Sequence, residues 1–125
     1  MSWSITFEQP NDLLVVKTTG DINYQQLKQM TKETFMAAKY NGASKVLGDH
    51  RALAVNVSKY DVYRLPRDLI EEGVSFPEKV AILYSEEAFK KEDFQFFEVT
   101  ASNVGMQVEL FTDPVAAREW LGATS

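Results

Sequence analysis

The sequence of 125 residues contains no cysteine and one histidine, His50. Without cysteine the chain can form no disulfide bond, no thiolate metal site and no cysteine nucleophile. One histidine also cannot supply the several imidazole ligands of a typical zinc site. The sequence therefore predicts neither a bound metal nor a cofactor.

Long apolar runs are also absent. No segment approaches the roughly 18 consecutive apolar residues that a membrane-spanning helix requires. The N-terminal segment 1–8 (MSWSITFE) has neither a basic leader nor an apolar stretch of signal-peptide length. We expect no membrane span and a cytoplasmic location.

Positive charge is in deficit, because 13 Lys and Arg face 18 Asp and Glu, for a formal charge of −5. The basic residues form no run or stripe, so the composition argues against nucleic acid as a partner. Hydrophobic residues make up 45% of the chain and aromatic residues 12%, which is enough for one ordinary core. We expect a single domain over residues 1–125.

Alternating strand and helix patterns follow one another along the chain. Apolar alternation and turn residues predict an N-terminal hairpin, and helix-capping residues mark where helices begin. Gly20-Asp21 is expected to end the second strand, and Pro66 to kink the second helix or to open a new turn. The predicted strands are 3–7, 13–17, 45–48, 79–84 and 107–111; the predicted helices begin at the caps Asn23, Ser58 and Asp113, with a further helix over 86–103.

This order predicts an α/β fold with a small five-stranded mixed sheet flanked by four helices. The first strand is antiparallel and the others are mainly parallel, because strand-helix-strand units of this length make right-handed crossovers. In such sheets ligands bind beyond the carboxyl ends of the strands.

The triplet Asp49-His50-Arg51 stands at one of these predicted strand ends. It offers a carboxylate, a base and an anion-binding guanidinium. Adjacent residues of a strand face opposite sides, however, so His50 points away from Asp49 and Arg51 if the chain is still extended there. No nucleophile, glycine-rich phosphate loop or metalloprotease motif accompanies the triplet, so we interpret His50 as a structural or solvent-facing residue and the protein as a non-enzyme.

Two helices carry more apolar surface than one packed face uses. In the third predicted helix Phe94, Phe97, Ala101 and Val104 share one face, while Phe89, Phe96 and Val99 point partly elsewhere. The second helix presents Tyr60, Tyr63 and Leu65 beside Arg64 and Arg67. A helix wedged inside the core explains this pattern, and so does an interface for a protein partner, a second copy of the chain or a ligand.

The closing segment 111–121 has the pattern Phe-x-Asp-x-x-x-Ala-x-x-Trp-Leu, and Gly20-Asp21 and Lys79-Val80-Ala81-Ile82 stand at matching places earlier in the chain. With this element order, the chain resembles the SpoIIAA-like proteins, relatives of the STAS anti-sigma-factor antagonists, over nearly its whole length. Trp120 itself is interpreted as a core residue.

The resemblance implies a protein-binding switch, in which STAS domains are phosphorylated on a serine of an Asp-Ser-Ser-Gly motif at the second helix. Here segment 56–59 reads Asn-Val-Ser-Lys, so valine stands at the position of the modified serine and only Ser58 follows it. The usual switch motif is missing. Ser58 is a candidate for modification, but a simple helix cap is the favoured interpretation.

Three hypotheses follow from these residues. The first is a STAS-like regulatory or interaction domain without the usual phosphoserine motif. The second is a carrier of a small apolar or acidic ligand, resembling the CRAL-TRIO lipid-binding side of the fold. The third, an enzyme using His50, has the least support. We favour the first, with partner- or ligand-binding residues among Asp49, His50, Arg51, Ser58, Tyr60, Arg64 and Arg67.

Overall fold

The computed structural model describes residues 2–55, 57–87, 101–102 and 104–123. Its element order is β1 (Ser2–Glu8), η1 (Gln9–Asn11), β2 (Leu13–Ile22), α1 (Tyr24–Tyr40), β3 (Lys45–Val55), α2 (Lys59–Glu71), β4 (Lys79–Leu83), β5 (Gln107–Phe111) and α4 (Pro114–Trp120). The predicted helix over 86–103 lies mostly outside the described residues, so the described part shows three α-helices where four were expected in the whole chain.

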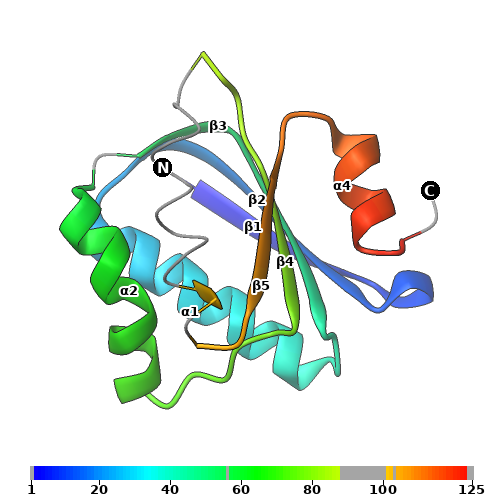
Figure 1. Cartoon of the computed structure of the whole chain (residues 1–125), viewed down its shortest axis with the longest axis horizontal. Coiled ribbons are helices and arrows are strands. Elements are labelled where there is room, and N and C mark those ends of the chain that lie inside the picture. The colour runs from blue at the N-terminus through cyan, green and yellow to red at the C-terminus, as the bar shows by residue number, and fades with distance from the viewer. Residues whose placement is uncertain (1, 56, 88–100, 103, 124–125) are drawn as a thin grey trace.

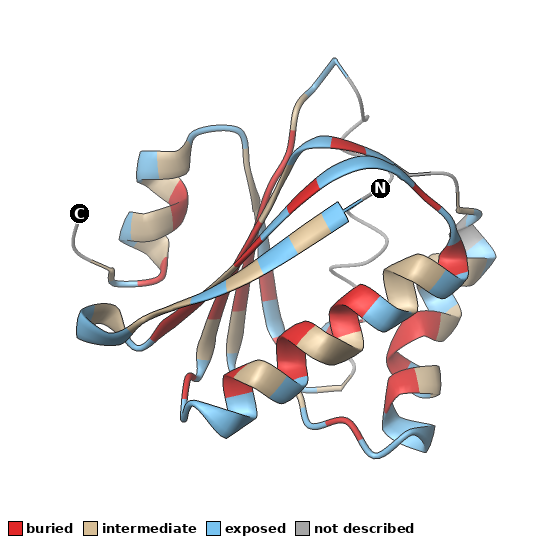
Figure 2. Cartoon of the chain, turned by 180° about the vertical axis from the view of Figure 1, so that it is seen from behind, coloured by how far each residue is buried: buried red, intermediate tan, exposed pale blue. Residues whose placement is uncertain are grey.

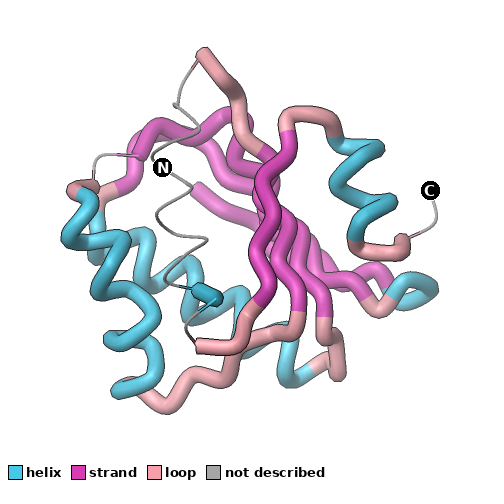
Figure 3. The backbone as a smooth tube through the Cα atoms, in the orientation of Figure 1, coloured by secondary structure: helices cyan, strands magenta, loops and turns pink. Residues whose placement is uncertain are grey.

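The strands form one five-stranded sheet in the order β1-β2-β3-β4-β5. β1 pairs antiparallel with β2, and the other neighbours are parallel, as predicted. Helices α1 and α2 lie on one face of the sheet and α4 lies on the other (Figures 1 and 3). The predicted α/β class and mixed sheet are confirmed.

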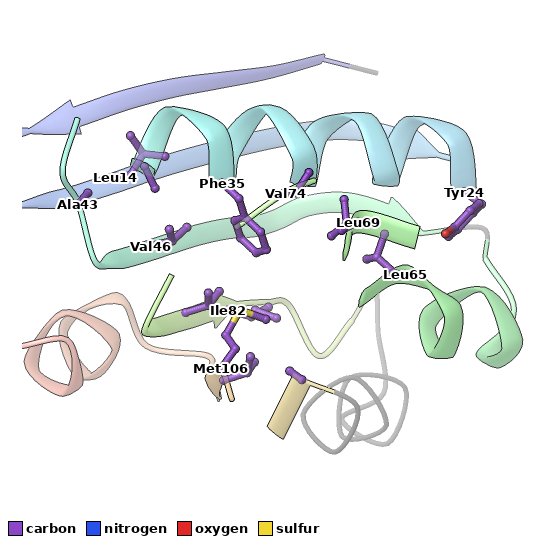
Figure 4. Close-up of a cluster of buried hydrophobic side chains, with 14 residues drawn as sticks. Leu14, Tyr24, Phe35, Ala43, Val46, Leu65, Leu69, Val74, Ile82 and Met106 are labelled. Atoms are coloured by element: carbon purple, nitrogen blue, oxygen red, sulfur yellow. The ribbon is translucent and has the colours of Figure 1, made fainter. Parts of the chain in front are cut away.

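The larger core lies between the sheet and α1 and α2 (Figure 4). Alternate residues of β2 show how the two faces are divided, since Leu14 enters this core whereas Leu13 enters the core under α4. Trp120 is half-buried, and its ring lies 5.8 Å from that of Phe111 against the α4 core. This supports its interpretation as a packing residue.

β2 and β3 are longer than predicted, which corrects two expectations. Gly20 and Asp21 do not end β2 but pair with Leu53 and Ala54 of β3. β3 likewise continues beyond Asp49, where its pairing with β4 stops. The two strands therefore project past the rest of the sheet and curve over the helices (Figures 1 and 2).

α2 continues through Pro66 as one helix, so no new turn opens there. The proline removes one backbone donor inside the helix, which costs helix stability unless packing compensates. Pro66 is itself buried, and Leu65 and Leu69 beside it are 2% and 1% exposed. Burial of these side chains against the sheet explains why the helix is not interrupted.

Candidate functional site

Three helices begin at the carboxyl edge of the sheet, and each has a side-chain cap. Asn23 of α1 and Gln26 form a reciprocal capping box, as do Ser58 of α2 and Asp61. The Asp113 carboxylate accepts from the backbone N–H of Val115 at the start of α4. The predicted caps are confirmed. They satisfy backbone donors that a helix start would otherwise leave unpaired.

Arg64 lies between two aromatic rings near the start of α2. Its guanidinium carbon is 3.9 Å from the ring centroid of Tyr24 on α1 and 5.7 Å from that of Tyr60. Its Nη2 is 3.1 Å from the Asp61 carboxylate, so the capping box also orients the arginine. Attraction between the cation and both π faces holds the guanidinium in place. We call Tyr24, Tyr60, Asp61 and Arg64 the arginine clamp.

Tyr24 joins this clamp to the body of α2. Its hydroxyl donates to the Asp68 carboxylate across 2.5 Å, and Figure 4 shows the ring next to α2. Burial, followed by the hydrogen bond to Asp68, raises the pKa of Tyr24 well above its ordinary value. The phenol therefore stays neutral, and its position links the first turn of α1 to the middle of α2.

The outer side of α2 is exposed and aromatic. Tyr60 is 67% and Tyr63 49% exposed, and Arg67 is also exposed. Leu65, which the sequence grouped with these tyrosines, instead lies in the core and is 2% exposed. We call Tyr60, Tyr63, Arg64 and Arg67 the α2 surface.

Asp49 and Arg51 form an ion pair on the face of the sheet that carries α4, opposite to the face covered by α1 and α2. Arg51 donates from Nε to Oδ1 at 3.0 Å and from Nη2 to Oδ2 at 2.8 Å. Asp49 stands level with Lys17 of β2 and with Leu83 of β4, whose side chain belongs to the α4 core. The hydrogen bond from Arg51, opposed by some burial, holds the pKa of Asp49 below its ordinary value.

His50 points to the helix side of the sheet, and so away from Asp49 and Arg51, as strand alternation predicted. Its Nδ1 lies 2.9 Å from the Thr18 hydroxyl on β2, and that hydroxyl also lies 3.4 Å from the carbonyl oxygen of Asp49. A Cβ at Gly48 would come within 2.6 Å of the imidazole Nε2, so the ring occupies the space that glycine leaves open. Burial lowers the pKa of His50 to about 4, against a smaller opposing effect of Asp49.

A β-bulge produces this arrangement. Lys17 pairs with Asp49 and Thr19 with Ala52, so His50 and Arg51 together stand opposite Thr18. An extra residue in one strand bends it and redirects its side chains. The bulge was not predicted from the sequence.

The structure thus separates the seven predicted site residues. Ser58, Tyr60, Arg64 and Arg67 lie together on α2, Asp49 and Arg51 lie on the α4 side of the sheet, and His50 points into the helix side. Sequence reasoning missed Tyr24, Asp68, Thr18 and Gly48. The one local signal for the contact at His50 was Gly48, because a glycine inside a strand often marks a place where another group packs close to the backbone.

Within the described residues, no group of three or more His, Asp or Glu side chains is placed to hold a metal ion. In the same part of the chain, no helix is both long and apolar enough to cross a membrane. Of the predicted aromatic third helix, Ala101 is buried and Val104 is half-buried; Phe89, Phe94, Phe96, Phe97 and Val99 lie outside the described residues.

No family model matches the sequence. No curated protein matches it either. Solved structures do match the fold. A DUF3478-family protein with a SpoIIAA-like fold from Shewanella loihica PV-4 is 20% identical and superposes with a TM-score of 0.59, over 95% of this chain and 93% of that one.

The anti-sigma factor antagonist SpoIIAA in its unphosphorylated form is 14% identical, with a TM-score of 0.54 over 99% of this chain and all of that one. This chain has a SpoIIAA-like fold. The predicted resemblance is confirmed at the level of the fold, since the match extends over essentially the whole chain. In this SpoIIAA-like fold Tyr24, Tyr60 and Asp61 of the clamp stand in the first turns of α1 and α2, at the carboxyl edge of the sheet where the sequence predicted binding, and the α2 surface extends from there along the helix to Arg67.

Proposed function

We propose that the protein is a STAS-like regulatory domain that binds a protein partner through the α2 surface. The observation that carries the proposal is the arginine clamp, in which exposed Tyr60 covers Arg64 at the start of α2. Tyrosine and arginine dominate the binding energy of many protein interfaces. The SpoIIAA-like fold supports the same class of function.

The chemistry of the α2 surface defines the partner. Two arginines and two tyrosines lie together on one helix of a chain whose net charge is −5. Such a surface suits a partner that presents carboxylates beside apolar groups, because guanidinium binds carboxylate through paired hydrogen bonds and tyrosine buries large area. The clamp has Arg64 already oriented, which lowers the entropy cost of binding.

Ser58 is a candidate for regulation of this surface. Its hydroxyl accepts from the backbone N–H of Asp61 at 3.1 Å, and the Asp61 carboxylate in turn accepts from the backbone N–H of Ser58. A phosphate on Ser58 gains from the helix dipole but stands against the Asp61 carboxylate that orients Arg64. Modification would therefore disturb the clamp, whereas the unmodified serine acts as a cap.

Catalysis by His50 is not part of this proposal. The imidazole is neutral, faces the helix side of the sheet, and its described partner is the hydroxyl of Thr18. Asp49 and Arg51 bind each other on the other side, so the three residues do not converge on one substrate. The third hypothesis, an enzyme using His50, thus has no geometric support from these residues.

The ligand-carrier hypothesis was motivated by the likeness to CRAL-TRIO domains and by the placement of Arg51, Arg64 and Arg67 near the predicted strand ends. Arg51 lies on the α4 side of the sheet whereas Arg64 lies on α2, so the described structure does not gather them. Native mass spectrometry of gently purified protein tests what remains of this hypothesis. A retained mass of a few hundred daltons, roughly that of one lipid or metabolite, would support the ligand-carrier hypothesis.

The test of partner binding compares four tagged proteins in quantitative affinity enrichment from the cells of origin: wild type, Tyr60→Ala, Arg67→Ala and Val115→Ala. Val115 is the matched control, because it is 61% exposed on α4, away from α2. We expect a protein that wild type and Val115→Ala enrich and the two α2 variants lose. Calorimetry with that purified partner should then show at least a tenfold weaker affinity for Tyr60→Ala, about 1.4 kcal/mol. Equal enrichment by all four proteins would contradict the proposal.

A further inference from the structure

The two edges of the sheet differ in how they are protected from pairing with other strands. β1 is an edge strand of seven residues, and no other strand of the described chain pairs with its outer side. Between Ser2 and Glu8 it contains no Lys, Arg or Pro, which commonly block such pairing, and its one charged residue, Glu8, stands at its end. At the opposite edge, β5 carries exposed Glu109 at its centre. Two β5 strands paired about this residue would set one carboxylate against another, but β1 has no such obstacle.

We propose that β1 pairs antiparallel with β1 of a second copy of this chain, which makes one continuous sheet across a two-fold axis. The axis passes through Ile5, so that Trp3 of each copy stands opposite Phe7 of the other and Ser4 stands opposite Thr6. Trp3, Ile5 and Phe7 lie on the helix side of β1, where Ile5 and Phe7 contact the main core. The pairing therefore joins aromatic and apolar side chains on one face and hydroxyls on the other, both favourable cross-strand combinations.

The register follows from the strand itself. Opposed residues of an antiparallel pair must share a face, so a slip by one residue would set apolar side chains against polar ones. The neighbouring allowed registers are centred on Ser4 or Thr6 and leave part of β1 unpaired. Only the register centred on Ile5 uses all seven residues from Ser2 to Glu8.

A stripe on α1 independently points to the same edge. Gln29, Glu33, Met36 and Tyr40 recur at the spacing of one helical face. The Trp3 indole N–H donates to the Glu33 carboxylate at 3.3 Å, which places this stripe on the β1 side of the helix. Met36 is 54% and Tyr40 91% exposed, so the apolar end of the stripe is uncovered. These are the side chains that a second α1 would cover.

The dimensions of the paired strands bring the two helices into contact. α1 contacts both β1 and β2, and it runs in the same direction as β1 (Figures 1 and 4). With strands about 4.8 Å apart, a helix beneath β1 and β2 lies about 5 Å from the two-fold axis, so the two α1 helices lie about 10 Å apart, a normal packing distance. Ile5 lies about 7 Å further along β1 than Trp3, and about 7 Å corresponds to between four and five residues of an α-helix. Because Trp3 contacts Glu33, the two-fold axis crosses α1 between four and five residues beyond Glu33. Met36 therefore lies near the axis, and Tyr40 stands about level with Met36 of the second copy.

Sedimentation equilibrium over a range of concentrations tests the pairing with two matched double variants. Ser4 and Thr6 are exposed, and Ser4 stands opposite Lys17 of β2. Ser4→Glu/Thr6→Glu places two pairs of opposed carboxylates across the axis, whereas Ser4→Glu/Thr6→Lys places two pairs of opposite charge there. We expect a wild-type dimer, at least a tenfold weaker dimer for the first variant, and dimerisation at least as strong as wild type for the second.

The α1 stripe is tested separately by Met36→Glu, with Ile70→Glu on α2 as the control, since Ile70 is 52% exposed and lies outside the proposed interface. Met36→Glu should weaken the dimer at least tenfold and Ile70→Glu should leave it unchanged. A wild-type chain that stays monomeric at every concentration would overturn the proposal. So would equal dimerisation of the two double variants, because charge at positions 4 and 6 would then not face a second copy. Circular dichroism of each variant confirms that its fold is retained.

Discussion

Protonation of His50 should oppose folding. The folded-state pKa of about 4 lies below the ordinary value, because burial penalises the charged imidazole. In the unfolded chain the same group titrates near 6.5. Between these values the unfolded chain binds more protons than the folded one, so acid shifts the equilibrium toward unfolding. The free energy of unfolding therefore has its full value above about pH 6.5 and falls as the pH is lowered toward 4.

The size of the effect follows from the two pKa values. One pKa unit corresponds to about 1.4 kcal/mol, so the whole interval limits the loss to about 3 kcal/mol. At about pH 5 the folded protein should already have lost about 2 kcal/mol of its free energy of unfolding relative to about pH 7.5. This is a large part of the stability of an ordinary small domain.

Urea unfolding of wild type and His50→Gln at both pH values measures this loss. Glutamine remains neutral and can keep a hydrogen bond to Thr18, so the variant should show a much smaller difference between the two conditions. Asp49 and Glu8 have lowered pKa values and lose their contributions only at lower pH, equally in both proteins. If His50→Gln loses as much stability as wild type, the imidazole is not shielded from water and the reasoning is wrong.

Three further substitutions test the packing at Gly48, the cap of α2 and the ion pair between Arg118 and Glu8. Gly48→Ala should cost about 1 to 3 kcal/mol in chemical denaturation, because the new Cβ meets the His50 ring at 2.6 Å, and the cost should shrink in a His50→Ala background. Ser58→Ala should lower stability by about 1 kcal/mol through loss of the α2 cap, while Ser58→Asp should restore most of it; equal losses would exclude a capping role. Arg118→Gln breaks the bidentate contact to Glu8 (2.7 and 2.8 Å) between α4 and the hairpin, and thermal unfolding should show a loss of about 1 kcal/mol that shrinks in high salt.

The order of elements was predictable because its signals are local. Asn23, Ser58 and Asp113 accept from backbone donors within the next three residues, so their effect is readable from short spacings. The chain reversal near Asp12, which has a positive φ of 49°, was predictable from Pro10 and Asn11 beside it. The alternation of side chains along a strand correctly predicted that His50 faces away from Asp49 and Arg51.

The lengths of β2 and β3 were not predictable from local signals. Gly20-Asp21 and Asp49-His50-Arg51 were interpreted as strand ends because glycine and charged residues are rare in strands. The structure keeps both segments in the sheet, since Asp21 and Arg51 are exposed to solvent and Gly20 pairs with Leu53. The mutual pairing of β2 and β3 outweighs the weak propensities of single residues.

The candidate site was predictable only in part. Ser58, Tyr60, Arg64 and Arg67 belong to one helix, so their proximity follows from helical spacing. The contact between Tyr24 and Asp68 joins residues 44 positions apart, and that between Thr18 and His50 joins residues 32 apart. Such pairs depend on how α1, α2 and the strands pack, which no short pattern specifies.

Helix α1 takes part in both proposed interactions. Tyr24 at its first turn holds Arg64, and Tyr40 at its last residue reaches toward the proposed second copy. Seventeen residues separate these ends of the helix by about 25 Å. Coupling between two sites requires an element with two alternative arrangements, and coupling acts equally in both directions. The capping box and the buried face of α1 favour one arrangement, so we expect Ser4→Glu/Thr6→Glu to break the dimer without changing the affinity of the α2 surface for its partner.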